Sequence, residues 1–503
     1  MKSFIYIFKL VKLFLLFSKH DAFEAFLPIA RGNPDLEMKI RHLRLFAKKK
    51  QTKRPGQRLA EALEALGPPY IKFGQLLSTR ADLMGEQGAL DLSVLQDQLA
   101  PFDASVVVET ISEAFDKPLE QLFPEFDMKP VSAASIAQVH FAKTHEGDDV
   151  AVKILRPNIK AIFERELDFL SWLTKIAEVF SPVLRRVRLP AVIGLYRAQL
   201  SIELDLRLEA SQADEFKANF KDRSDFFVPA IFWPLTAQSV MTIERLDATS
   251  IDDKEGLLAQ GSDLEDVLTR AAETFFMQIF EHGFFHGDQH AGNMFVTKDG
   301  SIAFVDFGIM GRMDWQSRCF LADIMAGLVR RDYSAIAKTY AEAGFLPTSH
   351  HNETFAMALR SVCEPIIDKP LKEVSFAKLL GQLLEMGRTF DLTVQPELYV
   401  LQKNMVMAEG IARTLAPEMN IWTFAQPLVE DWVVRNRNPL VQVKETLSVY
   451  AAAAGKMPKI IDSAEKTLAE MEKQRAKTRS WWIPLLIAAG FGAGILLTSL
   501  TLS

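Results

Sequence analysis

The sequence has few of the features that mark disulfide-bonded, zinc-binding or nucleic-acid-binding proteins. Only two of its 503 residues are cysteines, Cys319 and Cys363, and their separation does not match a metal-ligand motif. A disulfide scaffold or a zinc site is therefore not expected, and a reducing compartment fits. The formal net charge is −6, and no basic stripe is interleaved with aromatic residues, so no nucleic-acid partner is expected.

Further absences narrow the possible folds and activities. The chain has no internal repeat at the periods of solenoid proteins. It has neither a flavin fingerprint nor a histidine–carboxylate set for iron, which argues against a hydroxylase. Because 503 residues are too many for one ordinary core, we expect two or more domains.

The C-terminal end is predicted to cross a membrane. Residues 481–502 form an uncharged, apolar run that can span a hydrocarbon core of roughly 30 Å. Trp481 and Trp482 begin the run as an aromatic belt would, and basic residues precede it, so the main body is expected to be cytoplasmic. A buried core helix is the alternative, and Gly490 and Gly494 form a GxxxG pattern suited to pairing in a homodimer. The basic residues are Lys473, Arg475, Lys477 and Arg479.

The N-terminal end predicts a second contact with the membrane. Its apolar stretch is interrupted by lysines and is followed by no small-residue cleavage site, unlike a signal peptide. At helical spacing the lysines fall on one stripe, and phenylalanine and leucine cover the rest. We expect an interfacial helix over residues 1–20 with its lysines toward the head groups, and a second transmembrane span is the alternative. The lysines are Lys2, Lys9, Lys12 and Lys19.

The pattern between these ends changes from helical to mixed near residue 131. Helical periodicity, broken by proline and glycine, dominates the first 130 residues. The remainder mixes strands with longer helices, which predicts an α+β fold. The expected strands are 136–143, 150–155 and 239–244, and the expected helices are 158–180, 190–220 and 451–479.

A predicted hairpin brings three polar residues together. Apolar strands flank Lys298-Asp299-Gly300, and Asp-Gly is a strong hairpin signal. Folding the chain back at this turn would place Asn293 near Asp306, with Asp288 in the loop upstream facing both. Carboxylate and amide oxygens suit a hard cation such as magnesium, and a further carboxylate could orient a nucleophile.

The same residues match the order found in phosphoryl-transfer enzymes. Kinases carry an aspartate in a catalytic loop, an asparagine shortly after it, and a DFG aspartate that binds metal. Asp288, Asn293 and Asp306-Phe307-Gly308 reproduce this order and spacing. The alternative is an ordinary hairpin with polar ends, in which His286 and His290 are incidental loop residues.

A second signature of phosphate binding lies upstream, in VAVKILRP. Lys153 is placed there on an apolar strand, where a buried ammonium requires a partner. Kinases pair such a lysine with a helical glutamate, and Glu209 is the candidate. The segment before the strand, 132–137, has alanine where kinases have glycine. A surface lysine that extends to solvent is the alternative for Lys153.

Several short motifs together resemble the UbiB family of atypical kinase-like proteins. They are SAASIAQVH, VAVK, ELDLRLEA, HGDQHAGN and DFG, with KFGQ far upstream. The resemblance implies a two-lobed, protein-kinase-like α+β fold with an added N-terminal helical region and a C-terminal transmembrane helix. The implied divisions are 1–20 for the interfacial helix, 21–130 for a helical KxGQ extension, 131–245 and 246–450 for the two lobes, 451–480 for a juxtamembrane helix and 481–503 for the anchor.

The resemblance also implies roles for individual residues. Asp288 is implied to be the catalytic aspartate, with Asn293 and Asp306 as magnesium ligands. Lys153, paired with Glu209, is implied to bind the nucleotide. The KxGQ and ExD motifs are implied to be regulatory and to reach the cleft where a protein substrate would otherwise dock. Their residues are Lys72, Gln75, Glu203 and Asp205, and those of the alanine-rich loop over the nucleotide are Ala133, Ala134, Ser135, Ile136 and Ala137.

Together with these features, the resemblance to the UbiB family implies a membrane-anchored kinase-like enzyme that uses ATP and magnesium and supports ubiquinone biosynthesis at the bacterial inner membrane. No APE motif follows Asp306 within a plausible activation segment, which favours ATP hydrolysis coupled to lipid handling over protein phosphorylation. The expected partners are membrane lipids, prenylated quinone precursors and other ubiquinone-biosynthesis proteins. Two alternatives stay open: a small-molecule phosphotransferase, and a nucleotide-binding scaffold without turnover.

Overall fold

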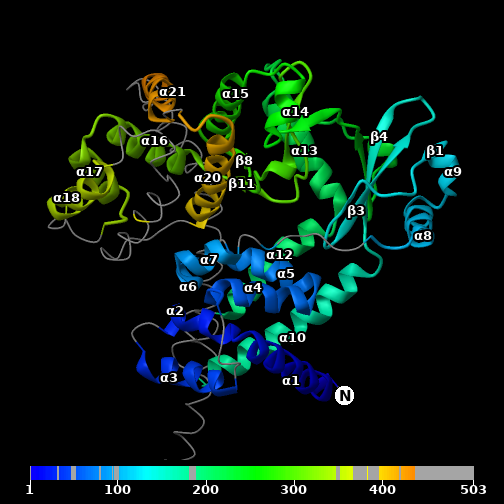
Figure 1. Cartoon of the computed structure of the whole chain (residues 1–503), viewed down its shortest axis with the longest axis horizontal. Helices are drawn as coiled ribbons and strands as arrows, with labels where there is room; N and C mark the ends of the chain where they lie inside the picture. The colour runs from blue at the N-terminus through cyan, green and yellow to red at the C-terminus, as the bar shows by residue number, and fades with distance from the viewer. Residues whose placement is uncertain are drawn as a thin grey trace, which may run out of the picture. The chain divides into compact units, whose positions relative to one another are not determined.

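The fold of the chain is α+β and mostly helical, as the computed structural model shows (Figure 1). Residues 1–430 form one compact unit, and residues 431–503 form a second. The described residues form three small sheets, and each belongs to the first unit. The structure describes residues 2–30, 33–46, 52–78, 81–92, 101–180, 189–346, 352–365, 396–418 and 421–436, with residues 95 and 382.

The N-terminal part is helical, as the sequence predicts. Its core is apolar and includes Leu59, Leu63 and Leu77, which pack with Phe163 and Tyr196 from later helices. Figure 1 shows α4, α5 and α7 beside α10 and α12, which follow much later in the chain. The elements are α1 (Lys2–His20), η1 (Ala22–Phe26), α2 (Leu27–Ala30), α3 (Pro34–Leu43), η2 (Arg44–Phe46), α4 (Pro55–Leu66), α5 (Pro68–Ser78), α6 (Ala81–Met84) and α7 (Glu86–Leu92).

Helix α1 forms where the sequence predicts it, but its lysines do not form one outward stripe. Lys9 turns toward the body of the protein, and its Nζ atom lies 2.6 Å from Glu166 Oε1 on α10. Helix α1 also exposes large apolar side chains, with Phe4 79% and Phe8 72% exposed. The expectation that the lysines face head groups is therefore wrong for Lys9. Its partner lies 157 residues away, so a local helical pattern could not show it.

The described part of the chain does not include the predicted membrane anchor. Among the described residues, no helix is both long enough and apolar enough to cross a membrane. The predicted span at 481–502, its Gly490–Gly494 pattern and the predicted helix at 451–479 lie outside the described residues.

The first sheet carries Lys153 and has the order β1-β3-β4-β6, with β2 paired to β3. The strand expectations near 136–143, 150–155 and 239–244 are confirmed to within one residue at their ends. Helix α8 packs against β4 and β6 and covers one face of this sheet (Figure 1). The elements are α8 (Ala104–Phe115), α9 (Leu119–Leu122), β1 (Glu125–Phe126), β2 (Ser132–Ala133), β3 (Ala137–Lys143), β4 (Asp149–Leu155) and β6 (Val240–Glu244).

Two long helical segments between β4 and β6 connect the helical region with the rest of the unit. The first, α10 (Ile159–Phe180), is confirmed, whereas the expected helix 190–220 is divided into α12 (Leu189–Glu203) and α13 (Leu206–Asn219). The division occurs at Asp205, because its side chain accepts a hydrogen bond from the Arg207 backbone and starts a new helix as an N-cap.

The remaining sheets hold the predicted hairpin. Strands β9 and β10 pair in antiparallel fashion, and Gly300 in their turn has a φ of 81°, which glycine adopts without steric cost. The hairpin prediction is confirmed. The strands are β5 (Phe226–Phe227), β7 (Ala248–Ser250), β9 (Met294–Thr297) and β10 (Ile302–Phe304) in one sheet, and β8 (Phe284–His286) and β11 (Met310–Arg312) in the other.

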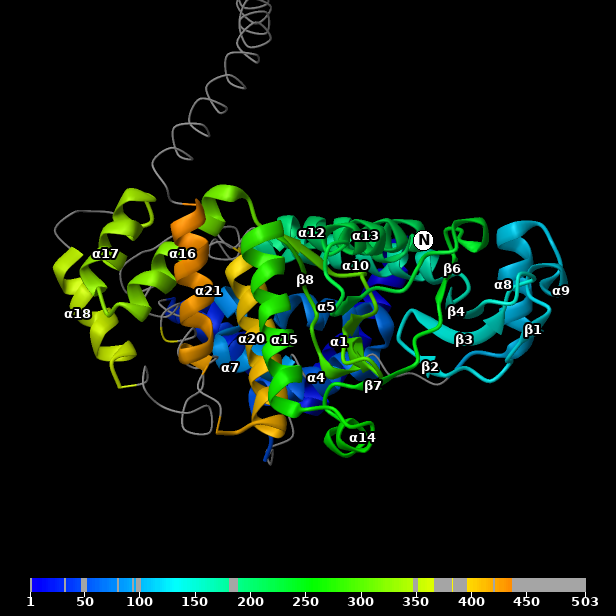
Figure 2. The ribbon, with the colours of Figure 1, turned by 90° about the horizontal axis from the view of Figure 1, so that it is seen from above.

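Helices surround these two sheets. Helices α15 and α20 lie side by side although about 120 residues separate them in the chain (Figures 1 and 2). The elements are α14 (Lys254–Ala259), α15 (Leu264–Met277), η4 (Gln278–His282), η5 (Ala291–Asn293), α16 (Trp315–Val329), α17 (Tyr333–Glu342), α18 (Asn352–Cys363) and α20 (Pro396–Leu415). The short helix η3 (Trp233–Leu235) instead contacts β6 of the first sheet, and α21 (Ile421–Asn436) follows α20 in the chain.

Phe216 of α13 holds this core together, because its ring is fully buried among other aromatic rings from three parts of the chain. Its centroid lies 5.5 Å from Phe307, 5.8 Å from Phe304 and 6.1 Å from Phe284. Since α13 also carries Glu209, this packing fixes the helix that reaches the candidate site.

We expect Phe216→Ala to lower the free energy of unfolding by about 3–5 kcal/mol, because the lost ring leaves a cavity that the sheet cannot close. Urea denaturation of purified protein measures the change. Leu208→Ala on the exposed face of the same helix is the control and should change stability little. Equal effects of the two changes would contradict the placement of α13 in this core.

Candidate functional site

Lys153 lies at the centre of the candidate site, because two carboxylates share its ammonium. Its Nζ atom lies 2.6 Å from Glu209 Oε1 and 3.0 Å from Asp306 Oδ1. The side chains of Lys153 and Glu209 are 14% and 3% exposed, whereas that of Asp306 is 51% exposed. The contact expected between Lys153 and Glu209 is present, and Asp306 is a third partner.

The shared ammonium shifts the pKa of each group. Burial lowers the pKa of Lys153, but the charges of Asp306 and Glu209 outweigh burial and place it above its ordinary value. Burial raises the pKa of Glu209, and Lys153 opposes this rise only in part. Burial also raises the pKa of Asp306, but Lys153 and the charge of Lys72 bring it below its ordinary value. Asp306 is therefore the carboxylate that is held ionised, on the more exposed side of the site.

Local structure explains how Lys153 and Glu209 meet. Lys153 lies in β4, between β3 and β6, so the strand directs its side chain inward. Glu209 lies in the first turn of α13, which begins at the Asp205 N-cap. The aspartate of the ExD motif, implied by the resemblance to act in the cleft, thus starts the helix that carries Glu209. It also binds the Arg207 guanidinium, with Nη2 at 2.6 Å from Oδ2.

The hairpin brings Asn293 and Asp306 together as expected. The Val305 N–H donates to the Asn293 carbonyl at 3.1 Å, which places Asp306 immediately beside this backbone contact. The Asn293 side chain is buried, and its Nδ2 donates to the Asp288 carbonyl at 3.1 Å. The loop that carries Asp288 is thereby tied to the end of the hairpin that carries Asp306.

Asp306 has a backbone conformation that few residues other than glycine adopt. Its φ is 62°, in the left-handed region. Such conformations cost about 1–3 kcal/mol and persist where surrounding contacts enforce them. Here the contact with Lys153 and the buried neighbour Phe307 hold the carboxylate toward the site.

His286 connects the loop that carries Asp288 with the segment that carries Asp306. It is therefore not the incidental loop residue that the alternative interpretation of the hairpin assumed. The ring is buried, and its Nε2–H donates to the Asp306 carbonyl at 2.8 Å and lies 3.1 Å from the Val305 carbonyl. Its Nδ1 accepts from the Asp288 N–H at 3.1 Å. These contacts require the neutral ring, and burial lowers the pKa of His286 accordingly.

A buried polar network supports the same loop from behind. Asn404 of α20 donates from Nδ2 to the His286 carbonyl at 2.7 Å. Gln278, at the start of the π-helical turn η4, accepts from the His286 N–H at 3.0 Å and from Gln289 Nε2 at 2.9 Å. The sequence did not reveal this network, because Asn404 lies 118 residues from His286 and follows no motif.

The alanine-rich loop forms a tight turn at the start of β3. The Ala134 N–H donates to the Ala137 carbonyl at 2.7 Å. Arg156, which follows β4, donates to the Ala134 carbonyl from Nη2 at 3.0 Å, and its backbone N–H donates to the Ile136 carbonyl at 2.8 Å. Sequence reasoning did not single out Arg156, although its place three residues after Lys153 put it within reach of this loop.

Helix α5 brings the KxGQ motif to the site. Lys72 Nζ lies 3.2 Å from Glu203 Oε2, the last residue of α12, and both side chains are largely buried. Gln75 donates from Nε2 to the Leu95 carbonyl at 3.2 Å. Lys72 therefore pairs with Glu203, and its charge also acts on Asp306.

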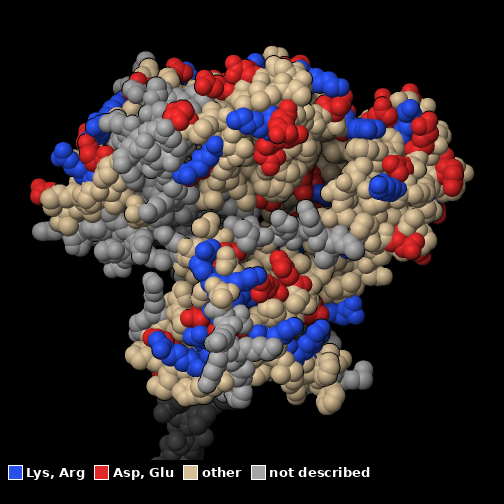
Figure 3. Space-filling view, viewed as in Figure 1, with Lys and Arg blue, Asp and Glu red and all other residues tan. Residues whose placement is uncertain are grey.

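The surface is hollowed where these elements meet. Figure 3 shows a hollow between the region of β3 and β4 and that of α13 and α14, with acidic and basic side chains inside it. Within the described part of the chain, no group of three or more histidine, cysteine, aspartate or glutamate side chains is arranged as a metal site. The assignment of Asn293 and Asp306 as metal ligands stays a prediction.

Comparisons with known proteins identify the family. Residues 94–340 match the ABC1 atypical kinase-like domain, and residues 359–420 match the UbiB helical domain. A probable protein kinase UbiB of Azotobacter vinelandii is 36% identical over 450 residues, which cover 88% of this chain and 83% of the relative. The chain belongs to the UbiB family.

A second relative and a solved structure complete the comparison. The probable protein kinase UbiB of Pseudomonas fluorescens is 34% identical over 467 residues, which cover 90% of this chain and 87% of that UbiB protein. The complex structure of Rv3197–erythromycin from Mycobacterium tuberculosis is 20% identical, with a TM-score of 0.43, and the match covers 71% of this chain and 94% of that one. The family domain makes the fold kinase-like, as the resemblance implied, and Asn404 lies within the UbiB helical domain.

Removing Lys153 should leave the buried Glu209 carboxylate and the half-exposed Asp306 carboxylate without the ammonium that they share. We expect Lys153→Met to lower the free energy of unfolding by about 3–5 kcal/mol. Adding Glu209→Gln should then restore part of the loss, because it removes the buried negative charge. Urea denaturation of the two single variants and the double variant provides the measurement.

The exposed pair Lys298–Asp247 offers a matched control, because Lys298→Met removes a lysine–carboxylate contact of 2.5 Å outside the site. It should give no measurable change. Strictly additive losses for Lys153→Met and Glu209→Gln would mean that the two side chains do not act on one another.

The neutral state of His286 predicts a pH dependence. Its pKa is lower in the folded than in the unfolded protein, so its contribution is complete above the unfolded pKa of about 6.5 and is lost as the pH falls further. We expect the melting temperature to drop between about pH 7.5 and about pH 5. His286→Gln should start lower and fall less steeply.

His290→Gln is the control, because it removes an exposed histidine of the same loop. It should keep the pH dependence of the unaltered protein. An equally steep fall in His286→Gln would assign the acid sensitivity to other groups.

Proposed function

We propose that this chain is an ATP- and magnesium-dependent kinase-like enzyme that supports ubiquinone biosynthesis. One observation carries the proposal: the Lys153 ammonium binds Glu209 and Asp306 at once. In kinases a strand lysine, a helical glutamate and the DFG aspartate together organise the nucleotide phosphates and their metal. The membership of the chain in the UbiB family supports the same reading.

Magnesium fits the residues present. The ion is commonly held by one or two side-chain oxygen ligands together with phosphates and water. Asp306 is ionised and half exposed. Asn293 lies near it, because the Asn293 carbonyl accepts a hydrogen bond from the backbone N–H of Val305, the residue before Asp306. These two residues would hold the ion, which supplies positive charge to a phosphoryl group in transfer. Lys153 would bind the phosphates from its place in β4 of the first sheet.

The remaining site residues would orient the reactants. Asp288, held by His286 through its backbone N–H, would accept a proton from the attacking hydroxyl or water. The turn at Ala133–Ala137, fixed by Arg156, would cover the nucleotide. Lys72 and Glu203 pair close to Asp306, which supports a regulatory position for the KxGQ helix and favours ATP hydrolysis over phosphorylation of a protein.

Lipid partners complete the proposal. The exposed apolar side chains of α1 support attachment to a membrane surface, and residues 481–502 would anchor the chain in the bacterial inner membrane with its body cytoplasmic. The proposed partners are membrane lipids, prenylated quinone precursors and other ubiquinone-biosynthesis proteins. A homodimer through Gly490 and Gly494 belongs to the same proposal.

Two substitutions separate metal binding from catalysis. Asp306→Asn removes a charged ligand and should abolish the rise in melting temperature that magnesium and ATP produce together. Asp288→Asn should keep this rise but lower ATP turnover by about a hundredfold or more. An undiminished rise in Asp306→Asn would overturn the metal assignment, and ATP binding without any turnover in the unaltered protein would favour the scaffold alternative.

The role in ubiquinone biosynthesis has its own measurement in cells. A strain that lacks the gene should accumulate quinone precursors, measured by mass spectrometry, and a copy encoding Asp306→Asn should fail to restore the product. If that copy restored the quinone product, the role in ubiquinone biosynthesis would not depend on Asp306 or on the nucleotide site.

A further inference from the structure

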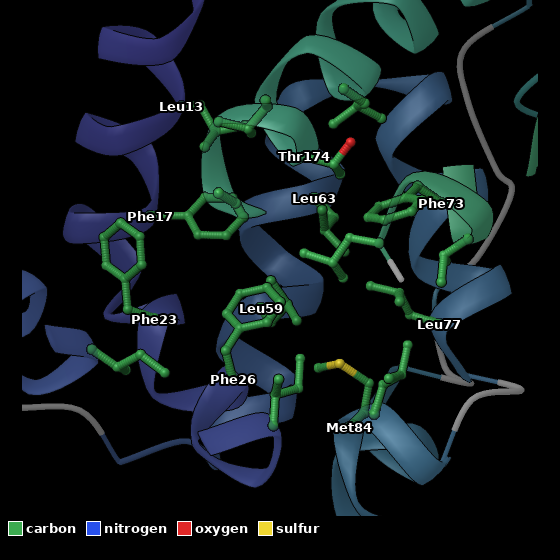
Figure 4. Close-up of a pocket in the computed structure, with 18 of the residues that line it drawn as sticks. Leu13, Phe17, Phe23, Phe26, Leu59, Leu63, Phe73, Leu77, Met84 and Thr174 are labelled. Carbon is green, nitrogen blue, oxygen red and sulfur yellow. The ribbon is translucent and has the colours of Figure 1, made fainter. Parts of the chain in front are cut away.

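The helical region encloses an apolar cavity of about 420 Å³ (Figure 4). Its lining residues come from α1, α3, α4, α5, α10 and α12 among others, and its described lining includes no residue of the candidate site. In Figure 4 the side chains of Phe17, Leu63 and Phe73 point toward this space from three different helices. Protein interiors are close-packed, whereas a volume of this size is typical of small-molecule sites.

The cavity offers a ligand almost no unsatisfied polar partner. Among its described lining residues, only Lys39, Tyr70 and Thr174 carry polar side-chain groups. Each of these groups already bonds within the protein. A polar ligand would therefore lose hydrogen bonds to water without replacement, whereas a hydrocarbon has no such hydrogen bonds to lose. The partners are Asp35 for Lys39 at 2.7 Å, Glu166 for Tyr70 at 2.9 Å and the Ser171 carbonyl for Thr174 at 3.0 Å.

Helix α1 joins this cavity to an exposed apolar surface. Its residues Leu13 and Phe17 line the cavity, while Phe4 and Phe8 on its other side are among the most exposed large apolar residues of the described chain. An apolar strip of this kind fits the surface of a lipid bilayer, because the helix also has Lys2 at its start and Lys19 in its last turn. A hydrocarbon ligand would then reach the cavity from the membrane itself.

Helix α3 supplies the exposed residues of the described lining, so the cavity would open there. Leu43 and Lys39 line the cavity, and both are also exposed to solvent. The Lys39 ammonium pairs with the exposed Asp35 carboxylate one turn away, so the opening is polar while the interior is apolar. This polarity suits an amphiphile with one hydrocarbon chain inside and its polar end at α3.

We propose that this cavity binds the hydrocarbon chain of a membrane amphiphile. The inference deepens the proposed lipid handling and rests on it for its biological meaning, but it is tested without nucleotide. Its failure would leave the ATPase assignment untouched. A prenyl chain and a fatty acyl chain share the chemistry that the lining recognises, and the experiment distinguishes the two sources.

Photo-crosslinking of the full-length protein in phospholipid vesicles tests the proposal. Palmitic acid and farnesol, each carrying a photoreactive diazirine at the end of the chain, are added separately, and labelled peptides are mapped by mass spectrometry. Labels on α4, α5 and α10 are expected. Competition by unlabelled palmitic acid or by unlabelled farnesol then shows which chain the cavity prefers.

Substitutions on α10 provide the matched comparison. Ala177→Trp places a large ring in the cavity and should lower labelling of α4 and α5 about tenfold, the loss expected when about two methylene groups lose their contacts. Val179→Trp puts the same ring on the exposed face of α10 and should leave labelling unchanged. Thr174→Phe fills the cavity in a second way, and melting temperatures establish that each variant is folded.

Labels confined to the exposed strip around Phe4 and Phe8 would show contact with the bilayer alone and would overturn the proposal. Undiminished labelling of α4 and α5 in folded Ala177→Trp and Thr174→Phe would overturn it as well. If Ala177→Trp does not fold, Thr174→Phe decides between the outcomes, because it fills the same space with a smaller increase in volume.

Discussion

The arrangement of this protein depends on the need of one buried ammonium for partners. Lys153 lies in a strand between two others, where an unpaired charge would be strongly unfavourable. Its two carboxylate partners come from α13 and from the loop after β10, which are far apart in the chain. The first sheet, the start of α13 and the end of the hairpin must therefore be placed together. Asp205 fixes where α13 begins. Phe216 fixes the same helix against the aromatic core that also contains Phe304 and Phe307.

The helical region is physically connected to this site because α5 and α12 each contribute to two places. Phe73 and Leu77 of α5 line the apolar cavity, while Lys72 of the same helix pairs with Glu203. Helix α12 likewise lines the cavity near its start and ends at Glu203. The same two helices therefore contact both the cavity and the Lys72–Glu203 pair, and the charge of Lys72 acts on Asp306.

What the sequence could predict was local in character or followed a motif. Strand alternation, the Asp-Gly turn and helical periodicity sufficed for β3, β4, β9, β10 and α10, and the kinase pattern sufficed for the contact between Lys153 and Glu209. Contacts between distant segments left no such trace. The contact between Lys9 and Glu166 joins residues more than one hundred positions apart, and so does the contact between His286 and Asn404. None of these four residues belongs to a pattern that would mark its partner. His286 and Asn404 are fully buried, and such polar groups need hydrogen-bond partners that a local sequence pattern does not reveal.

The three residues Asp306-Phe307-Gly308 show how packing and openness are combined at the site. Phe307 is buried beside Phe216 and His286, with ring centroids 5.5 Å and 5.7 Å away, and this anchors the segment in the core. With Phe307 anchored, Asp306 contacts Lys153 from a backbone conformation with a positive φ. A side chain at Gly308 would place its Cβ atom 3.4 Å from Asp306 Oδ1 and 3.8 Å from Glu209 Oε2. Glycine at this position therefore leaves the space next to both carboxylates free of a side chain, and the half-exposed Asp306 stays open to solvent while it holds Lys153.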